Sequence, residues 1–333
     1  MAYEDLAIRS KLISVLREGR VVLFVGAGCS IISGYPSWDE LIKKMHQTLI
    51  PSVTLPSGLD NTVYADLIKD QLVSMSQESM YLKYLDRTFK PQPGKSHQPF
   101  HRALVQLGFS GIVTTNYDIL LELAVDEVCA DRDAYQRCNP IDLCSHEPYR
   151  FRVFEFLRDL SQRNKYRGIL HIHGWYENPD RIILTRKDYQ RKYGELSDDG
   201  TEERKQKRPL DTIHRKVIWS LLTMHPILFV GFSMDDDFFM KTLEIVQKDF
   251  DLDRDPVHYA IMGYQSETQR DMMFDKLKSM GITTFFYQIV NRGTSGEQSH
   301  DGLIRIVSEL ADELNIHVEA PDLRTLNKKM LER

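Results

Sequence analysis

The chain has 333 residues, and its 43 Lys and Arg against 48 Asp and Glu give a formal net charge of −5. This mild acidity argues against broad nucleic-acid binding, which usually shows as a basic excess or stripe. Hydrophobic residues make up 42% of the chain and charged residues 27%, close to globular averages, which excludes a disordered or fibrous chain. The length suits about two domains of ordinary size.

Six short apolar runs predict strands, in chain order near 21–28, 111–116, 168–173, 226–231, 257–262 and 281–290. The runs are continuous rather than alternating, as is typical of strands buried on both faces of a parallel sheet. Helical patterns lie between them. Strands that alternate with helices predict an α/β fold with a doubly wound, mostly parallel, six-stranded Rossmann-like sheet.

The spacing of these strands is uneven, because three of the connections are far longer than one crossover needs. We expect mostly helical insertions at 40–100, 119–165 and 176–222, which form a smaller second subdomain and roof a cleft at the carboxyl edge of the sheet. One domain would span 1–318, and a polar tail would follow at 319–333. The strongly charged segment at 195–210 is interpreted as a solvated loop.

The cysteine spacing and the apolar runs bear on metal binding, on secretion and on membrane insertion. The first residues carry acids and lack the apolar run of a signal peptide, and the longest uncharged run, 21–38, contains Gly and Pro as a strand and turn do. We therefore expect a cytoplasmic protein without a membrane span. No C-x-x-C pair suggests a zinc or redox motif, and we expect no metal. The cysteines are Cys29, Cys129, Cys138 and Cys144.

A glycine-rich loop follows the first predicted strand directly and contains Gly26, Ala27, Gly28 and Ser30. Glycines there permit a tight turn and a close approach to a pyrophosphate, and the next helix presents its N-terminus. The loop departs from G-x-G-x-x-G because Ile31 stands at the third glycine position. The loop predicts dinucleotide binding, although the glycines could also serve only to turn the chain.

Four motifs carry a resemblance to a known family. GAGCSIISGYPSW at 26–38 resembles the opening motif of the Sir2 (sirtuin) superfamily, and TTNYD at 114–118 resembles its T-x-N-x-D motif. HIHG at 171–174 resembles the catalytic L-H-G motif, and GFS at 231–233 resembles a later G-x-S motif. The chain is most similar to the bacterial SIR2-like branch, which supplies NAD-cleaving effectors of anti-phage defence, such as the Sir2 subunit of Sir2–HerA systems.

The resemblance implies that 1–318 is a SIR2-like NAD-binding catalytic domain with NAD as its substrate. Cleavage of the nicotinamide–ribose bond has an oxocarbenium-like transition state, which positioning and electrostatics can stabilise. Asn116 could hold the ribose hydroxyls or orient a water, or it could be a turn residue. His173 could accept a proton from a ribose hydroxyl. His171, two residues earlier, is interpreted as a packed core histidine.

Other predicted contacts surround this pair. Asp118 could bind a ribose hydroxyl or cap the following helix. The aromatic pair Tyr35 and Trp38 belongs to the family's flexible cofactor-binding loop, although an N-terminal staple for a helix is an alternative. Further cofactor-binding residues expected from the motifs are Thr115, Gly231 and Ser233. Three acids at 235–237 are interpreted as a helix cap.

The predicted function is NAD+ glycohydrolysis to ADP-ribose and nicotinamide, used as an anti-phage abortive-infection effector. Such a toxic activity needs a trigger, so the resemblance implies homo-oligomers and a sensor or activator, such as a HerA-type ATPase. A protein deacylase is the first alternative, although the two zinc-binding C-x-x-C pairs of deacylase sirtuins are absent. A non-catalytic NAD or ADP-ribose sensor is the second. The sequence leaves hydrolysis and cyclisation of NAD unresolved.

Overall fold

The structure is a computed structural model of the chain. It describes residues 3–129, 137–145, 150–160, 168–194, 212–234, 236–250, 257–292 and 297–316. The predicted loop at 195–210 and the predicted tail at 319–333 lie outside these ranges.

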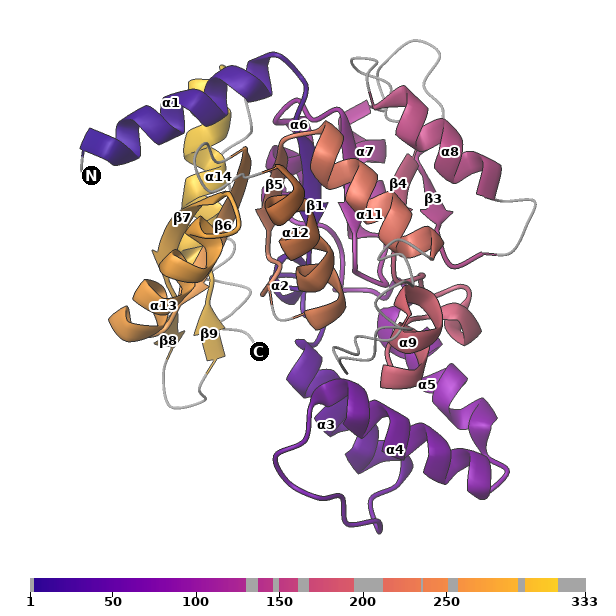
Figure 1. Cartoon of the computed structure of the whole chain (residues 1–333). Helices are drawn as coiled ribbons and strands as arrows, with labels where there is room; N and C mark the ends of the chain where they lie inside the picture. The colour runs from indigo at the N-terminus through magenta and orange to yellow at the C-terminus, as the bar shows by residue number, and fades with distance from the viewer. Residues whose placement is uncertain are drawn as a thin grey trace.

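A parallel sheet forms the centre of the protein (Figure 1), with the strand order β3-β4-β2-β1-β5-β6-β7. The strands are β1 (Val22–Val25), β2 (Gly111–Thr114), β3 (Asn139–Asp142), β4 (Gly168–His171), β5 (Ile227–Val230), β6 (His258–Tyr264) and β7 (Ile282–Gln288). The predicted α/β class and doubly wound parallel sheet are confirmed, and six of these strands lie within or overlap the six predicted runs.

The strand β3 corrects the predicted number of six strands, because the described sheet has seven. Its sequence, Asn-Pro-Ile-Asp, has no apolar run from which a strand could be predicted. It pairs in parallel with β4 at the edge of the sheet. An edge strand tolerates Pro140 because one side of its backbone needs no ladder donor.

The order of the other six strands places a crevice at the centre of the sheet. Counted without β3, they follow the order 3-2-1-4-5-6 of doubly wound nucleotide-binding sheets. The order reverses between β1 and β5, which pair from Val22 with Ile227 to Val25 with Val230. Ligands of such sheets bind outside the carboxyl ends of the strands at this point.

Helices cover both faces of the sheet (Figure 1). One face carries α8 (Arg150–Asp159), α11 (Ile213–Met224), α12 (Asp237–Phe250) and α13 (Glu267–Lys278). The other carries α1 (Tyr3–Arg17), α6 (Pro99–Gln106), α7 (Leu120–Cys129) and α14 (Asp301–Glu313). All four residues of β1, β2, β4 and β5 are therefore buried, which explains their continuous apolar patterns.

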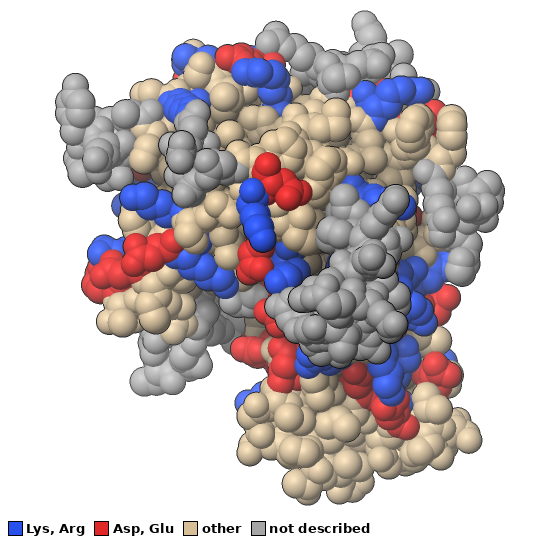
Figure 2. Space-filling model, in the orientation of Figure 1, with Lys and Arg blue, Asp and Glu red and all other residues tan. Residues whose placement is uncertain are grey.

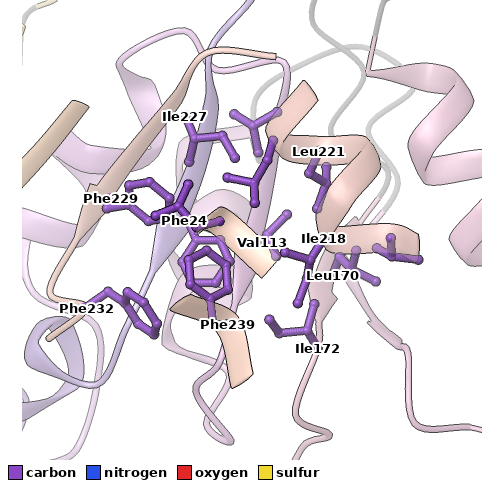
Figure 3. Packing of buried hydrophobic residues seen from close by; sticks show 14 of the residues in the cluster. Phe24, Val113, Leu170, Ile172, Ile218, Leu221, Ile227, Phe229, Phe232 and Phe239 are labelled. Atoms are coloured by element: carbon purple, nitrogen blue, oxygen red, sulfur yellow. The ribbon is translucent and has the colours of Figure 1, made fainter. Parts of the chain in front are cut away.

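Aromatic rings dominate the core under α12 (Figure 3). The ring of Phe24 on β1 lies 5.2 Å from that of Phe229 on β5 and 5.0 Å from those of Phe232 and Phe239. Aliphatic side chains of β2, β4 and α11 continue this core beneath α11. The cluster fixes the start of α12 against the ends of β1 and β5.

A helical lobe lies below the sheet in Figure 1 and consists of α3 (Trp38–Leu49), α4 (Asn61–Ser74) and α5 (Glu78–Phe89). It has its own apolar core around Met45, Ile68 and Leu85. The helix α9 (Arg186–Tyr193) joins α4 through ion pairs from Lys187 to Asp70 at 2.6 Å and from Lys69 to Asp188 at 3.9 Å. Figure 2 shows charged side chains gathered where this lobe meets the rest of the protein.

The remaining described elements are short. They are α2 (Gly28–Ile31), the 3₁₀ turn η1 (Pro179–Arg181), and a hairpin of β8 (Val290–Arg292) and β9 (Glu297–Ser299). Among the described residues, the helices are too short or too polar to span a bilayer.

Candidate functional site

A cavity of about 600 Å³ opens at the carboxyl edge of the sheet, a volume typical of small-molecule sites. The loops after β1, β2, β4 and β5 line it, together with α9 and the start of α3. Its other end reaches β6, β7 and α13 through Met262, Lys276 and Tyr287. The predicted site residues that line it are Ala27, Gly28, Ser30, Tyr35, Trp38, Thr115, Asn116, Asp118, His173, Gly231 and Ser233.

The glycine loop after β1 packs directly against the loop after β5. A Cβ atom on Gly26 would lie 2.5 Å from the carbonyl oxygen of Gly231, so Gly26 stands behind the cavity and permits this contact. Gly231 has φ +66°, and a Cβ there would lie 2.6 Å from the amide nitrogen of Cys29. The amide of Gly28 donates to Gly231 O at 2.8 Å, so this donor is already used within the protein.

Hydrogen bonds hold Asn116 at the end of β2 and leave its side-chain oxygen without a donor among the described residues. Its Nδ2 donates to Gly26 O at 3.1 Å and to Ser30 Oγ at 2.9 Å. Its backbone amide donates to Thr114 Oγ1 at 3.0 Å. Among the described residues, no donor reaches its buried Oδ1. An oriented, desolvated acceptor in a cavity is a group that a ligand hydroxyl or a water can satisfy.

Asp118 caps the following helix, which is one of the two roles that the sequence left open, and its contact with a ribose hydroxyl stays a prediction. Its Oδ1 accepts the amide of Leu120 at 3.1 Å, which caps α7, and its Oδ2 accepts the Ser30 hydroxyl at 2.7 Å. The carboxylate is buried but lines the cavity. Burial raises the pKa of Asp118, and the hydrogen bond from Ser30 offsets part of this rise.

His171 is the packed core histidine that the sequence predicted. It is fully buried, with Nδ1 2.8 Å from the carbonyl oxygen of Asn116 and Nε2 2.7 Å from Glu122 Oε1. Burial lowers its pKa, but the charge and hydrogen bond of Glu122 raise the pKa of His171 overall. Two acceptors around one ring favour the imidazolium, which ties the backbone of Asn116 to α7.

His173 lies at the cavity, enclosed by the aromatic rings of Tyr189 and Tyr193. It is 2% exposed, and its Nε2 hydrogen-bonds with the Tyr193 hydroxyl at 2.8 Å. The ring of Tyr189 meets it edge to face, with ring centroids 5.2 Å apart. Burial lowers the pKa of His173 to about 3, so the imidazole is neutral at physiological pH.

Tyr35 and Trp38 hold the start of the helical lobe against the cavity. Tyr35 stacks on Phe89 of α5, and Trp38 begins α3 and stacks on Tyr189 of α9. Ser37 caps α3 through a reciprocal pair of hydrogen bonds with Glu40. The segment therefore starts a capped helix and also lines the cavity, and its role in cofactor binding stays a prediction.

Sequence reasoning missed three residues beside His173. Tyr189 and Tyr193 lie on α9, inside a segment interpreted only as a helical insertion, and no motif marks them. Asp236 was interpreted as part of a cap, and it does cap α12, since the amide of Phe239 donates to its Oδ1 at 3.0 Å. It also lines the cavity, with Oδ2 3.7 Å from His173 Nε2.

Metal ligation finds no support in the described part of the chain, which holds no group of three or more His, Cys, Asp or Glu able to bind an ion. The four cysteines are buried, and none forms a disulfide within the described residues. Burial raises the pKa of the Cys29 thiol, and the Asp118 carboxylate adds to this effect. Cys29 is therefore a small core residue rather than a nucleophile.

Together, the strand order and the cavity define a doubly wound α/β protein with a nucleotide-type cleft at its switch point. Residues 110–285, more than half of the chain, match the family description of a SIR2-like domain. The chain belongs to the SIR2-like family.

Individual relatives are more distant. The chain is 26% identical over 245 residues to defense-associated sirtuin 2 of Bacillus subtilis, covering 73% of this chain and 20% of that protein. It is 26% identical over 197 residues to the NAD(+) hydrolase ThsA of Acinetobacter baumannii, covering 56% of this chain and 34% of that protein. The chain thus spans a fifth to about a third of these relatives. A solved Sir2 homolog–NAD complex aligns with 92% of this chain and 94% of its own, at 12% identity and a TM-score of 0.43.

Proposed function

We propose that this chain is an NAD+ glycohydrolase, which cleaves NAD+ with water to ADP-ribose and nicotinamide. The observation that carries the proposal is the convergence of Asn116 and His173 in one cavity, with the Asn116 Oδ1 acceptor unsatisfied among the described residues. The chain's similarity to proteins named NAD(+) hydrolase supports the same reaction. The catalytic unit of this proposal is the domain at 1–318.

The shape of the cavity suits an extended dinucleotide. One end holds Asn116 and His173, and the other reaches Tyr287 and His300 beyond the loop that follows β5. In this proposal the nicotinamide ribose lies at the first end and the adenosine at the second. Ala27, Gly28, Gly231 and Ser233 line the region between them, where the pyrophosphate would pass.

Each residue near the ribose has a distinct part in the proposed reaction. Asn116 Oδ1 accepts a hydrogen bond from a ribose hydroxyl or from the attacking water, and the neutral ring of His173 hydrogen-bonds to a ribose hydroxyl. The carboxylate of Asp118 faces the positive charge that develops at C1′ as the bond to nicotinamide breaks. Fixed dipoles and charges aimed at developing charge usually contribute more to catalysis than any other single effect.

The test is to incubate the purified chain with NAD+ and to measure nicotinamide and ADP-ribose by chromatography. Asn116→Ala and His173→Ala should each lower product formation by about 100-fold or more, on the order of what general acid–base or oxyanion groups contribute. Glu244→Gln, exposed on α12, is the control that keeps activity. Either alanine variant that cleaves NAD+ at the wild-type rate would refute the assignment, and a cyclic product would change the reaction class.

A role in anti-phage defence is part of the proposal, supported by the name of the Bacillus subtilis relative. The activity would be switched on by self-assembly or by a partner such as a HerA-type ATPase, which the same assay tests when the partner is added. Acyl-peptide turnover with formation of O-acyl-ADP-ribose would instead favour a deacylase. No C-x-x-C pair occurs in the sequence, which counts against that alternative.

A further inference from the structure

Asp236 is a buried carboxylate in which one oxygen caps a helix and the other lies near His173. It stands between β5 and α12, and its side chain is 3% exposed. Its Oδ1 accepts the amide of Phe239. Within the described residues, Oδ2 has no hydrogen bond of ordinary geometry, although the Tyr189 hydroxyl lies close enough to stabilise the carboxylate. Oδ2 lies 3.7 Å from His173 Nε2. Serine, threonine and asparagine cap helices as well as aspartate does, so the cap does not require this second oxygen.

The surroundings of Asp236 make its negative charge energetically costly. From α9 it faces Tyr189 and Tyr193, from the end of β4 it faces His173, and from its own helix it faces Asp237. Within the described residues, its charge pairs with neither lysine nor arginine. A buried carboxylate without a cation costs free energy, and a carboxylate perturbed in this way at a cleft is a candidate functional group.

Burial shifts the pKa values of Asp236 and His173 in opposite directions. Burial raises the pKa of Asp236 to about 6, although the amides of Phe239 and Phe238 and the nearby Tyr189 hydroxyl offset part of the rise. Burial lowers the pKa of His173 to about 3. The carboxylate is therefore ionised near neutral pH and remains basic enough to take a proton, whereas the imidazole resists protonation.

We propose that Asp236 is a further catalytic residue, whose Oδ2 takes the proton from the water that attacks the ribose. This proposal rests on the NAD+ hydrolysis proposed above. The bond between C1′ and the nicotinamide nitrogen breaks, and its electron pair neutralises the pyridinium ring. The water oxygen bonds to C1′, one of its protons passes to Asp236 Oδ2, and that proton is released to solvent afterwards.

The chemistry provides a test that separates proton transfer from bond cleavage. A pyridine nitrogen that attacks C1′ carries no proton, so exchange of labelled nicotinamide into NAD+ needs no proton acceptor, whereas hydrolysis does. In Asp236→Asn, hydrolysis should fall by about 100-fold or more, the usual contribution of a general base. Exchange should stay within a few-fold of the wild type.

The pH profile gives a second readout. Wild-type hydrolysis should decline below about pH 6 as Asp236 is protonated, and this acid limb should be absent from the residual activity of Asp236→Asn. Asp236→Ser, which also keeps a capping oxygen, should behave in the same way if the asparagine variant folds poorly. Glu244→Gln, which removes an exposed charge farther along α12, should keep both reactions.

Three results would overturn the proposal: hydrolysis and exchange falling together in the Asp236 variants, hydrolysis at the wild-type rate in either of them, or an equal loss in Glu244→Gln. A wild-type protein that performs neither reaction, alone or with its activator, overturns the proposed function and this inference with it. Loss of hydrolysis with exchange retained supports both.

Discussion

Replacing Asp236 with Asn should make the folded protein more stable at alkaline pH. Burial raises the pKa of this carboxyl from 3.8 to about 6. Because the folded state holds the proton more tightly than the unfolded state, the free energy of unfolding falls as pH rises through the interval between these values. Above this interval the folded protein carries the full cost of a desolvated charge, and asparagine removes that cost.

The magnitude follows from the two pKa values. Their difference corresponds to about 3 kcal/mol at pH 8, since one pKa unit is worth about 1.4 kcal/mol. The asparagine oxygen can keep the hydrogen bond from Phe239, so the cap is retained. We expect a net stabilisation of about 3 kcal/mol at pH 8.

The assay is urea unfolding of the wild type and Asp236→Asn, followed by tryptophan fluorescence at pH 8 and at pH 4. The variant should exceed the wild type by about 3 kcal/mol at pH 8. The difference should fall below about 1 kcal/mol at pH 4, where the carboxyl is neutral in the folded protein and close to half neutral in the unfolded chain. Equal stability at pH 8, or the same gain at both pH values, would show that the carboxylate is not held desolvated.

Two further predictions concern the support of the site. Gly231→Ala should lower the free energy of unfolding by about 3 kcal/mol or more, because its Cβ would meet the Cys29 backbone and its φ is positive. Gly34 also has a positive φ, +83°, but open space around it, so Gly34→Ala should cost only about 1 kcal/mol. Equal losses in urea unfolding would contradict the backbone contact. Glu122 keeps the pKa of His171 raised, so the free energy of unfolding of the wild type should fall as pH rises above about 6.5. Glu122→Gln should abolish this fall. An unchanged slope of unfolding free energy against pH, between about pH 5.5 and 9, would refute the pairing of Glu122 with His171.

The sequence predicted the fold well because its central strands are buried on both faces. Continuous apolar runs such as Val22–Val25 and Ile227–Val230 have few other places in a globular protein. The edge strand β3 escaped prediction, since Asn139 is exposed and Pro140 breaks the usual strand pattern. Its position depends on pairing with β4, a tertiary contact that has no signature in the local sequence.

The site was predictable where a residue directly follows a central strand. Asn116 and His173 follow β2 and β4, so the parallel topology brings them to one edge. Tyr193 and Asp236 reach His173 from segments that only the fold brings together. The desolvation of His173, and hence its low pKa, depends on these neighbours and has no local signature in the sequence.

The position of β1 has a consequence for how the protein is made. β1 lies between β2 and β5, yet β5 is synthesised about two hundred residues after it. Contacts of such long sequence separation form late in folding. A nascent chain that already contains Asn116 and His173 still lacks Gly231 and Asp236, so its cleft has one wall missing. An enzyme that destroys its host's NAD+, as proposed here, would thus stay harmless on the ribosome until most of its domain has emerged.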